Sequence, residues 1–296
     1  MTTTGIGDRA MSDSEPKLID LLDLEQIEIN FFRGQSHKTG APQVFGGQVL
    51  GQALMAASRT VDGYHVHSLH SYFLRGGDMQ APIIYDVDRI RDGRSFCTRR
   101  VVAIQHGRPI FNMSASFQKD EEGYEHQADM PDVPGPDGLK SDREIKEEIF
   151  SRKGHPFNPY LMPDWPIEVR RVEDNLPTRK PKILPPKQHV WIKAHDPLPD
   201  NSVIHKSTLA YASDLNLLST ATQPHGISYM AGNVRLATID HSMWFHRPFK
   251  TDEWLLYAME SPSSSGSRGF CRGLIFNQQG QLIASCTQEG LMRKLD

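Results

Sequence analysis

The sequence predicts an α+β protein built from two similar units, in each of which an antiparallel sheet wraps around one helix. The first observation is a repeated motif, Arg94-Ser-Phe-Cys-Thr-Arg99 in one half of the chain and Arg268-Gly-Phe-Cys-Arg-Gly273 in the other. Gly107 and Gly280 mark a hairpin turn beyond each motif. The second observation is that each half places a helix-like stretch ahead of several β-type segments. A repeat of about 170 residues is far longer than a solenoid period of roughly 20–45 residues, and indicates a duplicated domain.

The elements follow the same order in both halves. A helix-like stretch spans 49–57 in the first half and 207–221 in the second. Upstream of the repeated motifs, His70-Ser-Tyr-Phe73 matches His241-Ser-Met-Trp244. Segments rich in β-branched and aromatic residues predict strands. These segments are 65–75, 82–90, 96–105 and 109–118, then 234–245, 253–260, 270–277 and 282–292. A helix followed by antiparallel strands favours α+β packing, with the apolar face of the sheet on the helix.

Two more helices are expected outside the repeated elements. Apolar residues recur at steps of three and four from Lys17 to about Phe32, which predicts an amphipathic helix packed on the core. A charged stretch at 141–151 predicts another helix. It lies within 131–186, which holds 11 of the 20 prolines of the chain. This proline-rich segment is expected to be an extended linker that runs outside both units.

These features divide the chain into four parts. The first 16 residues lack both a signal-peptide pattern and a regular apolar pattern, and are expected to form a disordered tail. The parts are the tail over 1–16, a first unit over 17–130, the linker over 131–186 and a second unit over 187–296.

The composition excludes several classes of function. With 38% hydrophobic and 23% charged residues, the chain has the profile of a folded globular protein. A net charge of -3 gives no electrostatic footprint for nucleic acid. No run of about 18 apolar residues could span a membrane. Cys97, Cys271 and Cys286 fit neither a disulfide framework nor a CxxC metal site, which favours a reducing compartment, so a cytoplasmic protein is expected.

Several long motifs carry a family resemblance. They are Phe45-Gly-Gly-Gln-Val-Leu-Gly-Gln-Ala-Leu54, His67-Ser-Leu-His-Ser-Tyr-Phe-Leu-Arg75, Ala237-Thr-Ile-Asp-His-Ser-Met-Trp-Phe-His-Arg-Pro248 and the segment 269–292. The chain resembles the TesB-like acyl-CoA thioesterase II family from about Leu18 to Met292. The resemblance implies a double hotdog fold and hydrolysis of medium- to long-chain fatty acyl-CoA to free fatty acid and CoA. It also implies no cofactor, no metal and a homodimer or homotetramer.

The same resemblance places a water-activating trio on Asp214, Thr238 and Gln288. In that role Asp214 takes the proton of the attacking water as general base. Thr238 and Gln288 hold the water so that its lone pair faces the thioester carbonyl. Apart from the resemblance, Asp214 reads as a helix-capping or solvated carboxylate, and the other two as ordinary strand residues. An aspartate beside Ala212 and Leu215 on an otherwise apolar helix is nevertheless unusual, because an unpaired buried charge is costly.

The stretch Phe45-Gly46-Gly47-Gln48 comes just before the first-half helix. Glycines at a helix start let a ligand approach backbone N–H groups, and the helix dipole favours negative charge there. We therefore expect an N–H near Gly47 or Gln48 to bind the thioester oxygen in the transition state. Tight packing of a central helix against its neighbours is the alternative interpretation.

The histidines have simpler explanations. His65, His67 and His70 have a metal-like spacing, but in a strand the last of them faces away from the other two, and no carboxylate or cysteine lies in the same short segment. His67 is a weaker rival to Asp214 as general base. His241 and His246 are interpreted as packing residues.

Two other functions stay open from the residues alone. Hotdog hydratases carry an Asp-x-Asn-Pro-x-His pattern; here Asp214-Leu-Asn216 begins it, but Leu217 and Ser219 replace the proline and the histidine. A non-catalytic acyl-CoA-binding protein is the second alternative, disfavoured by the intact trio. A serine hydrolase is rejected, because the stretch 265–269 lacks the G-x-S-x-G spacing. The first half has no copy of the trio, since the position of Gln288 falls near Ser114 and Ala115, so one site per chain is expected.

Overall fold

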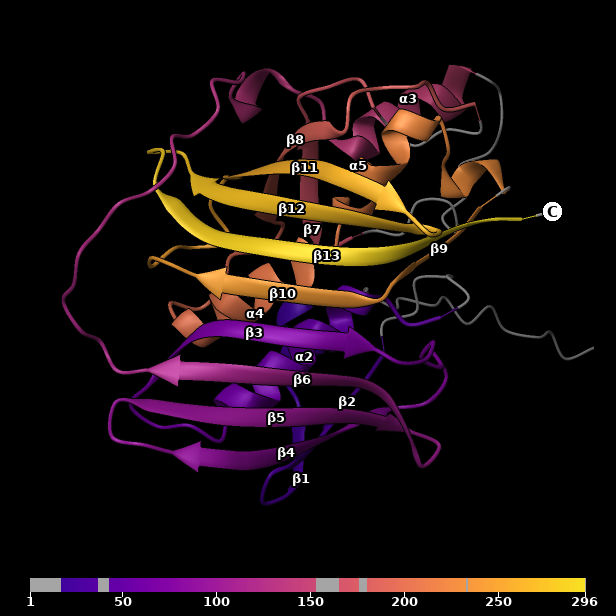
Figure 1. Cartoon of the computed structure of the whole chain (residues 1–296). Helices are drawn as coiled ribbons and strands as arrows, with labels where there is room; N and C mark the ends of the chain where they lie inside the picture. The colour runs from indigo at the N-terminus through magenta and orange to yellow at the C-terminus, as the bar shows by residue number, and fades with distance from the viewer. Residues whose placement is uncertain (1–16, 37–42, 153–164, 176–179, 233, 296) are drawn as a thin grey trace, which may run out of the picture.

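The computed structural model of the chain describes residues 17–36, 43–152, 165–175, 180–232 and 234–295. The tail expected over 1–16 lies outside these ranges. All strands of the described residues belong to one antiparallel sheet, in the order β1-β2-β4-β5-β6-β3-β10-β13-β12-β11-β8-β7, with β9 beside β13. Figure 1 shows this sheet facing the viewer, with α2 and α4 behind it.

The strands of the two halves correspond one to one from the centre of the sheet outward. The first unit contains β1 (Glu25–Glu28), β2 (Phe31–Gly34), β3 (His65–Phe73), β4 (Ile83–Asp92), β5 (Phe96–Gln105) and β6 (Arg108–Gln118). The second contains β7 (Ile167–Arg171), β8 (Lys187–Ala194), β9 (Val234–Thr238), β10 (Asp240–Phe245), β11 (Leu255–Ser265), β12 (Arg268–Asn277) and β13 (Leu282–Lys294). The helices are α1 (Leu18–Leu22), α2 (Gly46–Ser58), α3 (Asp142–Arg152), α4 (Ser202–Ser213) and α5 (Leu217–Thr222). The predicted α+β class is confirmed.

Strands β3 and β10 join the two units. They pair antiparallel at the centre of the sheet, with Ser71 opposite His241 and His70 opposite Ser242. The Ser71 hydroxyl also donates to the backbone oxygen of His241 at 2.7 Å. Ladder hydrogen bonds therefore continue without interruption from one unit into the other.

Helices α2 and α4 pack against each other on the inner side of the sheet. Helix α2 is buried along nearly its whole length, which suits its run of apolar and small residues. A Cβ added to Gly51 would lie 2.9 Å from the Ser207 carbonyl oxygen, and one added to Gly47 would overlap the carbonyl oxygen of Tyr211. The two helices therefore run antiparallel, and the N-terminus of α2 lies beside the C-terminus of α4.

The amphipathic helix expected over 17–32 is wrong beyond its first turn. Only Leu18–Leu22 is helical, and the hairpin of β1 and β2 follows. Asn30 at the turn of the hairpin has a φ of 67°, a left-handed conformation that asparagine tolerates well. Strand β2 then pairs with β4 at the edge of the sheet, and this pairing outweighs the helical spacing of the apolar residues.

Two elements that were expected to be continuous are broken near Asp214 and Thr238. The helix expected over 207–221 ends at Ser213 and resumes at Leu217, because Asn216 has a left-handed φ of 67°. The strand expected over 234–245 is divided into β9 and β10 at Ile239. Both interruptions lie next to a predicted site residue.

The segment 131–186 is more than a linker outside both units. The charged helix predicted at 141–151 is confirmed as α3, which starts with a capping box. Ser141 N donates to the Glu144 carboxylate at 2.7 Å, and Glu144 N donates to the Ser141 hydroxyl at 3.2 Å. The expectation that the whole segment runs outside is wrong for β7, which adds an edge strand to β8 and buries Ile167 and Val169.

Bulges show which residues of the two units correspond. The pairing register shifts just after Ala103 in the β5–β6 hairpin and just after Ile275 in the β12–β13 hairpin. Ala103 therefore occupies the position of Ile275. The same register keeps Gly107 matched with Gly280, both of which have a positive φ in the hairpin turn.

The other residues matched by the repeated motifs do not superpose. Strand β5 begins at Phe96 and β12 at Arg268, so the match of Phe96 with Phe270 is two residues out of register. The match of His70 with His241 is one residue out. A one-residue slip exchanges the faces of a sheet. His241 is accordingly buried against the helices, whereas His70 is exposed on the outer face.

Gly51→Ala is expected to destabilise the protein. Alanine gains up to about 1 kcal/mol of helix propensity over glycine, but a Cβ 2.9 Å from the Ser207 carbonyl oxygen forces the two helices apart, and such overpacking costs about 1–3 kcal/mol. Thermal and urea unfolding measure the change. Gly123→Ala is the control, because its Cβ would meet nothing within 4 Å. An unfolding temperature for Gly51→Ala equal to or above that of the wild type would contradict the close packing of α2 on α4.

Candidate active site

Asp214 ends helix α4 at the edge of a cavity of about 470 Å³. Because the chain turns at the left-handed Asn216, the helix stops here and its last side chain faces the N-terminus of α2. A Cβ on Gly46 would lie 2.6 Å from Asp214 Oδ2, so only glycine leaves room for the carboxylate. The Gly47 N–H donates to the same carboxylate. The positive end of the α2 dipole therefore stabilises the negative charge of Asp214.

The three residues of the predicted trio come together from three elements. Thr238, at the end of β9, donates its hydroxyl to Asp214 Oδ1 at 3.1 Å. Gln288 on β13 donates its Nε2 to the Thr238 hydroxyl at 2.8 Å. The Gln288 side chain is completely buried, and its register opposite Cys271 on β12 fixes its position.

The charge of Asp214 is held in a place that disfavours it. Burial raises the pKa of the Asp214 carboxyl above its ordinary value. The nearby His241 and the hydrogen bonds from Thr238, Gly47 and Gln288 oppose this rise only in part. A carboxylate with a raised pKa is a stronger base than a solvated one, which suits a group that takes a proton from water.

The two residues expected to bind an oxyanion lie at the start of α2. The Gly47 N–H donates to Asp214, and the Gln48 N–H donates to the Phe45 carbonyl at 3.1 Å. The Gln48 side chain turns away and donates to the Gln35 carbonyl at 3.2 Å. A thioester oxygen that approached this helix terminus would take the place of one of these acceptors.

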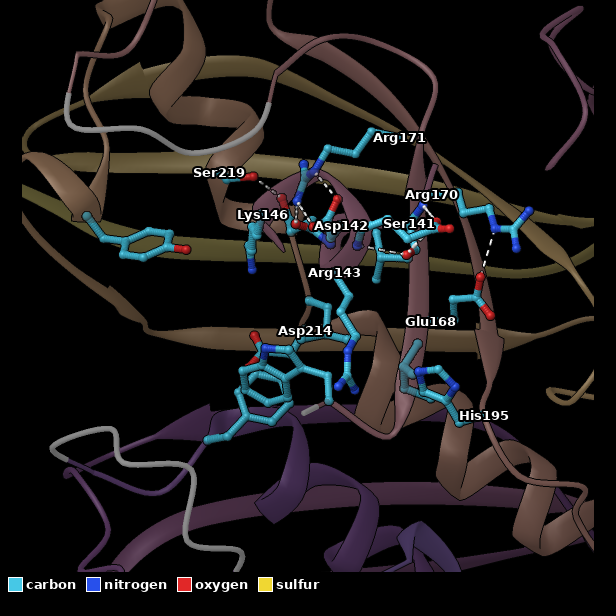
Figure 2. Close-up of a pocket in the computed structure, with 18 of the residues that line it drawn as sticks. Ser141, Asp142, Arg143, Lys146, Glu168, Arg170, Arg171, His195, Asp214 and Ser219 are labelled. Atoms are coloured by element: carbon cyan, nitrogen blue, oxygen red, sulfur yellow. Dashed lines mark hydrogen bonds and ion pairs between the residues drawn. The ribbon is translucent and has the colours of Figure 1, made fainter. Parts of the chain in front are cut away.

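The cavity beside Asp214 has one apolar and one charged wall. The apolar wall consists of Phe45, Trp165, Leu215, Leu218 and Leu236. Figure 2 shows the charged wall, where Asp142 and Lys146 of α3 face the side of the cavity that holds Asp214.

A buried ion pair ties α3 to the turn that follows Asp214. Arg171 on β7 makes two contacts of 2.8 Å with the Asp142 carboxylate, and its Nη2 donates to Asn216 Oδ1 at 2.6 Å. Sequence reasoning predicted α3 but not its place in this wall, because nothing in a charged helix identifies a partner more than 20 residues away.

His241 is the functional candidate that sequence reasoning missed. Its ring is completely buried, with Nδ1 2.9 Å from Gln288 Oε1 and Nε2 2.9 Å from the Ser213 hydroxyl. The misaligned match with the exposed His70 concealed its inward position; a register taken from the glycine turn and the strand start would have revealed it.

The other histidines lie apart from this site. His67 contacts the Ser116 hydroxyl at 2.8 Å and stacks edge-on against Phe96. His246 contacts the Ser285 hydroxyl at 2.8 Å. In the part of the chain that the structure describes, no three His, Cys, Asp or Glu side chains are grouped as a metal ion requires.

The first unit holds apolar residues at the corresponding positions. Ala115 pairs with Arg99 on β5 as Gln288 pairs with Cys271 on β12, so Ala115 is the counterpart of Gln288. By the same registers, Val66 is the counterpart of Thr238 and Leu69 that of His241. All three counterparts are buried. Helix α2 also continues through a buried apolar run, Ala53 to Ala57, in the stretch where α4 ends at Asp214.

No helix of the described residues has the length and apolar character to cross a lipid bilayer. Comparison with known proteins gave consistent matches over almost the whole chain. The model of the acyl-CoA thioesterase N-terminal domain matches residues 34–118, and the acyl-CoA thioesterase model matches residues 162–291. Acyl-CoA thioesterase 2 of Haemophilus influenzae is 44% identical over 284 residues, covering 96% of this chain and 99% of that protein.

Solved structures agree with these matches. The acyl-CoA thioesterase II TesB2 of Mycobacterium marinum is 44% identical and superposes with a TM-score of 0.77, covering 94% of this chain and 97% of that one. A conserved protein with a hot dog fold from Alicyclobacillus acidocaldarius, 20% identical, superposes with a TM-score of 0.72 and covers 94% of this chain and 98% of its own. The expected double hotdog fold is therefore confirmed.

Proposed function

The chain belongs to the acyl-CoA thioesterase family and hydrolyses acyl-CoA thioesters, and we propose that Asp214 is the general base of this reaction. The observation that carries the proposal is the convergence of Asp214, Thr238 and Gln288 through hydrogen bonds of 3.1 and 2.8 Å at the edge of an enclosed cavity. A base, two groups able to orient a water, and room for a substrate are what thioester hydrolysis requires.

In the proposed reaction, a water held by Thr238 and Gln288 attacks the carbonyl carbon of the thioester. Asp214 takes one proton from this water as the new carbon–oxygen bond forms. The carbonyl oxygen becomes an oxyanion, which the N–H of Gly47 or Gln48 at the start of α2 stabilises. When the oxyanion collapses, the carbon–sulfur bond breaks, and the CoA thiolate accepts the proton from Asp214. The products are a fatty acid and CoA, and the carboxylate of Asp214 is regenerated.

The structure does not favour hydratase chemistry at this site. The position at which a hydratase motif places its histidine holds Ser219, whose hydroxyl donates to the Asn216 carbonyl at 2.6 Å and accepts from Gln188 at 3.0 Å. The serine therefore stabilises the turn after α4. The position of the motif's proline holds Leu217, which is buried in the core.

We further propose that the acyl group is a medium- to long-chain fatty acyl chain. The wall formed by Phe45, Trp165, Leu215, Leu218 and Leu236 offers apolar surface next to Asp214, and a cavity of about 470 Å³ lies within the range of roughly 300–1,000 Å³ that is usual for ligand sites.

The family membership supports a homodimer or homotetramer. A cytoplasmic location is supported by three cysteines that are all unpaired and buried, since unpaired cysteines are usual in a reducing compartment.

Asp214→Asn is expected to reduce kcat by about a hundredfold or more, because it removes the general base, while KM changes little. In the wild type the rate should rise with pH through an acidic limb, since the carboxylate is the active form. The limb should lie above the ordinary aspartate pKa, because burial raises the pKa of Asp214. Release of CoA, followed with a thiol reagent against pH, measures both effects.

The control for folding is thermal unfolding of the same variant. A carboxyl whose pKa is raised in the folded state makes ionisation unfavourable to folding above its unfolded pKa, so Asp214→Asn should be at least as stable as the wild type at neutral pH. His67→Ala tests the rival base and should keep nearly full activity. A stable Asp214→Asn enzyme with wild-type turnover, or one disabled instead by His67→Ala, would move the general base away from Asp214.

Thr238→Val and Gln288→Leu should each slow turnover by roughly ten- to a thousandfold, because each removes a group that positions the reacting water. Since both side chains serve the same water, their effects should be less than additive in the double variant. Turnover of the two single variants and the double variant forms the test. A double variant whose loss in ln kcat equals the sum of the single losses would show that the residues act independently.

The length of the acyl chain should control kcat/KM. Each methylene that enters the apolar cavity contributes about 0.8 kcal/mol, or about a fourfold gain in kcat/KM, until the cavity is full. A series of saturated acyl-CoAs from four to eighteen carbons, about eight substrates, measures this dependence. A kcat/KM that is highest for the shortest chain would exclude the apolar cavity as the acyl site.

A further inference from the structure

His241 is a buried polar side chain that the proposed reaction does not use directly. Its ring is completely shielded from solvent on the inner face of β10, and it lies between the end of α4 and strand β13. Nδ1 is 2.9 Å from Gln288 Oε1, and Nε2 is 2.9 Å from the Ser213 hydroxyl. The imidazole therefore continues the hydrogen-bond chain of the site by two further links.

The chemistry of the two ends gives this chain a direction. At one end the Asp214 carboxylate is only an acceptor, so the Thr238 hydroxyl must donate to it. The Thr238 oxygen then accepts from the amide nitrogen of Gln288. This leaves Gln288 Oε1 facing Nδ1 of the imidazole, an arrangement that is a hydrogen bond only if Nδ1 carries a proton.

The surroundings of the ring supply the matching tautomer. Burial lowers the pKa of His241 below its ordinary value, so the imidazole is neutral near physiological pH and carries one proton. With that proton on Nδ1, Nε2 is an acceptor, and the Ser213 hydroxyl at 2.9 Å donates to it. The backbone oxygen of Ser213 is held in turn by the Tyr257 hydroxyl at 2.9 Å, which keeps the end of α4 in place.

We propose that His241 is a positioning residue that sets the orientation of the Gln288 amide. Its Nδ1–H holds Oε1, turns the amide NH₂ toward Thr238, and so directs the Thr238 hydroxyl at Asp214. Without this donor the amide can rotate by 180°, because a carboxamide has nearly the same shape in both orientations. In the rotated form Oε1 faces Thr238, and the threonine hydroxyl donates to Gln288 in place of Asp214.

The duplication provides an internal comparison for this role. The first unit has Leu69 at the position of His241, with Val66 and Ala115 at the positions of Thr238 and Gln288. All three are buried in the core of that unit. The fold therefore accommodates an apolar side chain at the position of His241, and the imidazole occurs together with the rest of the polar chain.

The groups around the chain do not titrate together with it in a neutral assay. Burial raises the pKa of each of the phenols and thiols that face it, to about 11 for Cys271 and about 12 for Cys286. The titratable groups nearby are Tyr211 on α4, Asp240 on β10, Tyr257 on β11, Cys271 on β12 and Cys286 on β13. The Asp240 carboxylate accepts the Glu289 N–H at 2.9 Å. An acidic limb in the rate is therefore a measure of Asp214.

A matched pair of variants separates the two nitrogens of the ring. In His241→Asn, the side-chain amide reaches the position of Nδ1 and can still donate to Gln288, but its contact with Ser213 is lost. In His241→Gln, the longer side chain reaches the position of Nε2 and keeps the contact with Ser213, but the donor to Gln288 is lost. Both variants place an uncharged amide in the same buried space, so a merely structural role would affect them alike.

The proposal, which rests on Asp214 as the base, predicts that His241→Gln loses roughly tenfold or more in kcat with KM unchanged. Its acidic limb should move to higher pH, because Asp214 loses the hydrogen bond that favours its ionised form. His241→Asn should keep kcat within about threefold of the wild type and keep the position of the limb. Equal losses in both variants, or a greater loss in His241→Asn, would overturn the proposal. If His241→Gln is fully active while Asp214→Asn is inactive, the inference fails and the proposed base stands.

A measurement on the unaltered protein covers the case in which a variant fails to fold. Nitrogen-15 NMR of the imidazole, assigned through bonds, reports which ring nitrogen carries the proton. The expected result at neutral pH is a neutral His241 with its proton on Nδ1. A proton on Nε2, or a charged imidazolium, would reverse or remove the donor to Gln288 and would overturn the proposal.

Discussion

The pairing of β3 with β10 is the constraint on which the rest of the molecule depends. It joins two sheets into one and places α2 antiparallel to α4 on the inner face of that sheet. The start of α2 therefore lies beside the end of α4, where the Gly47 N–H meets Asp214. A carboxylate from one unit and a helix terminus from the other thus form a single site. Neither unit contains this arrangement by itself.

The two units show how a buried polar chain differs from an ordinary core. Burying a polar side chain is unfavourable unless each of its groups is hydrogen-bonded. In the first unit Val66, Leu69 and Ala115 avoid this cost by packing as apolar residues. In the second unit Thr238 and Gln288 are buried or half-buried, and each has hydrogen-bond partners in the chain that ends on Asp214. We attribute the persistence of this chain to the reaction, because the same fold forms without it in the other unit.

Much of this architecture follows from the sequence, and the failures have physical causes. Strand patterns and the glycine turns predict the hairpins of both units, and the family motifs predict the trio that the structure brings together. The break at Asn216 and the β1–β2 hairpin could not be read from periodicity, since a left-handed asparagine and an edge pairing depend on tertiary contacts. His241 was misjudged because matching short motifs gives an alignment one residue out of register, and in a strand that error exchanges buried and exposed faces.

The central claim is that the thioester is hydrolysed at the junction of the two units, beside the chain that ends on Asp214. A crystal structure of Asp214→Asn with an uncleaved acyl-CoA tests it most directly, since that variant keeps the shape of the site. The account predicts the thioester carbon at about 3–3.5 Å from a water held by Thr238 and Gln288, with the acyl chain against Phe45, Trp165 and Leu215. A thioester bound beside His67, or bound with its carbonyl remote from residue 214, would contradict it.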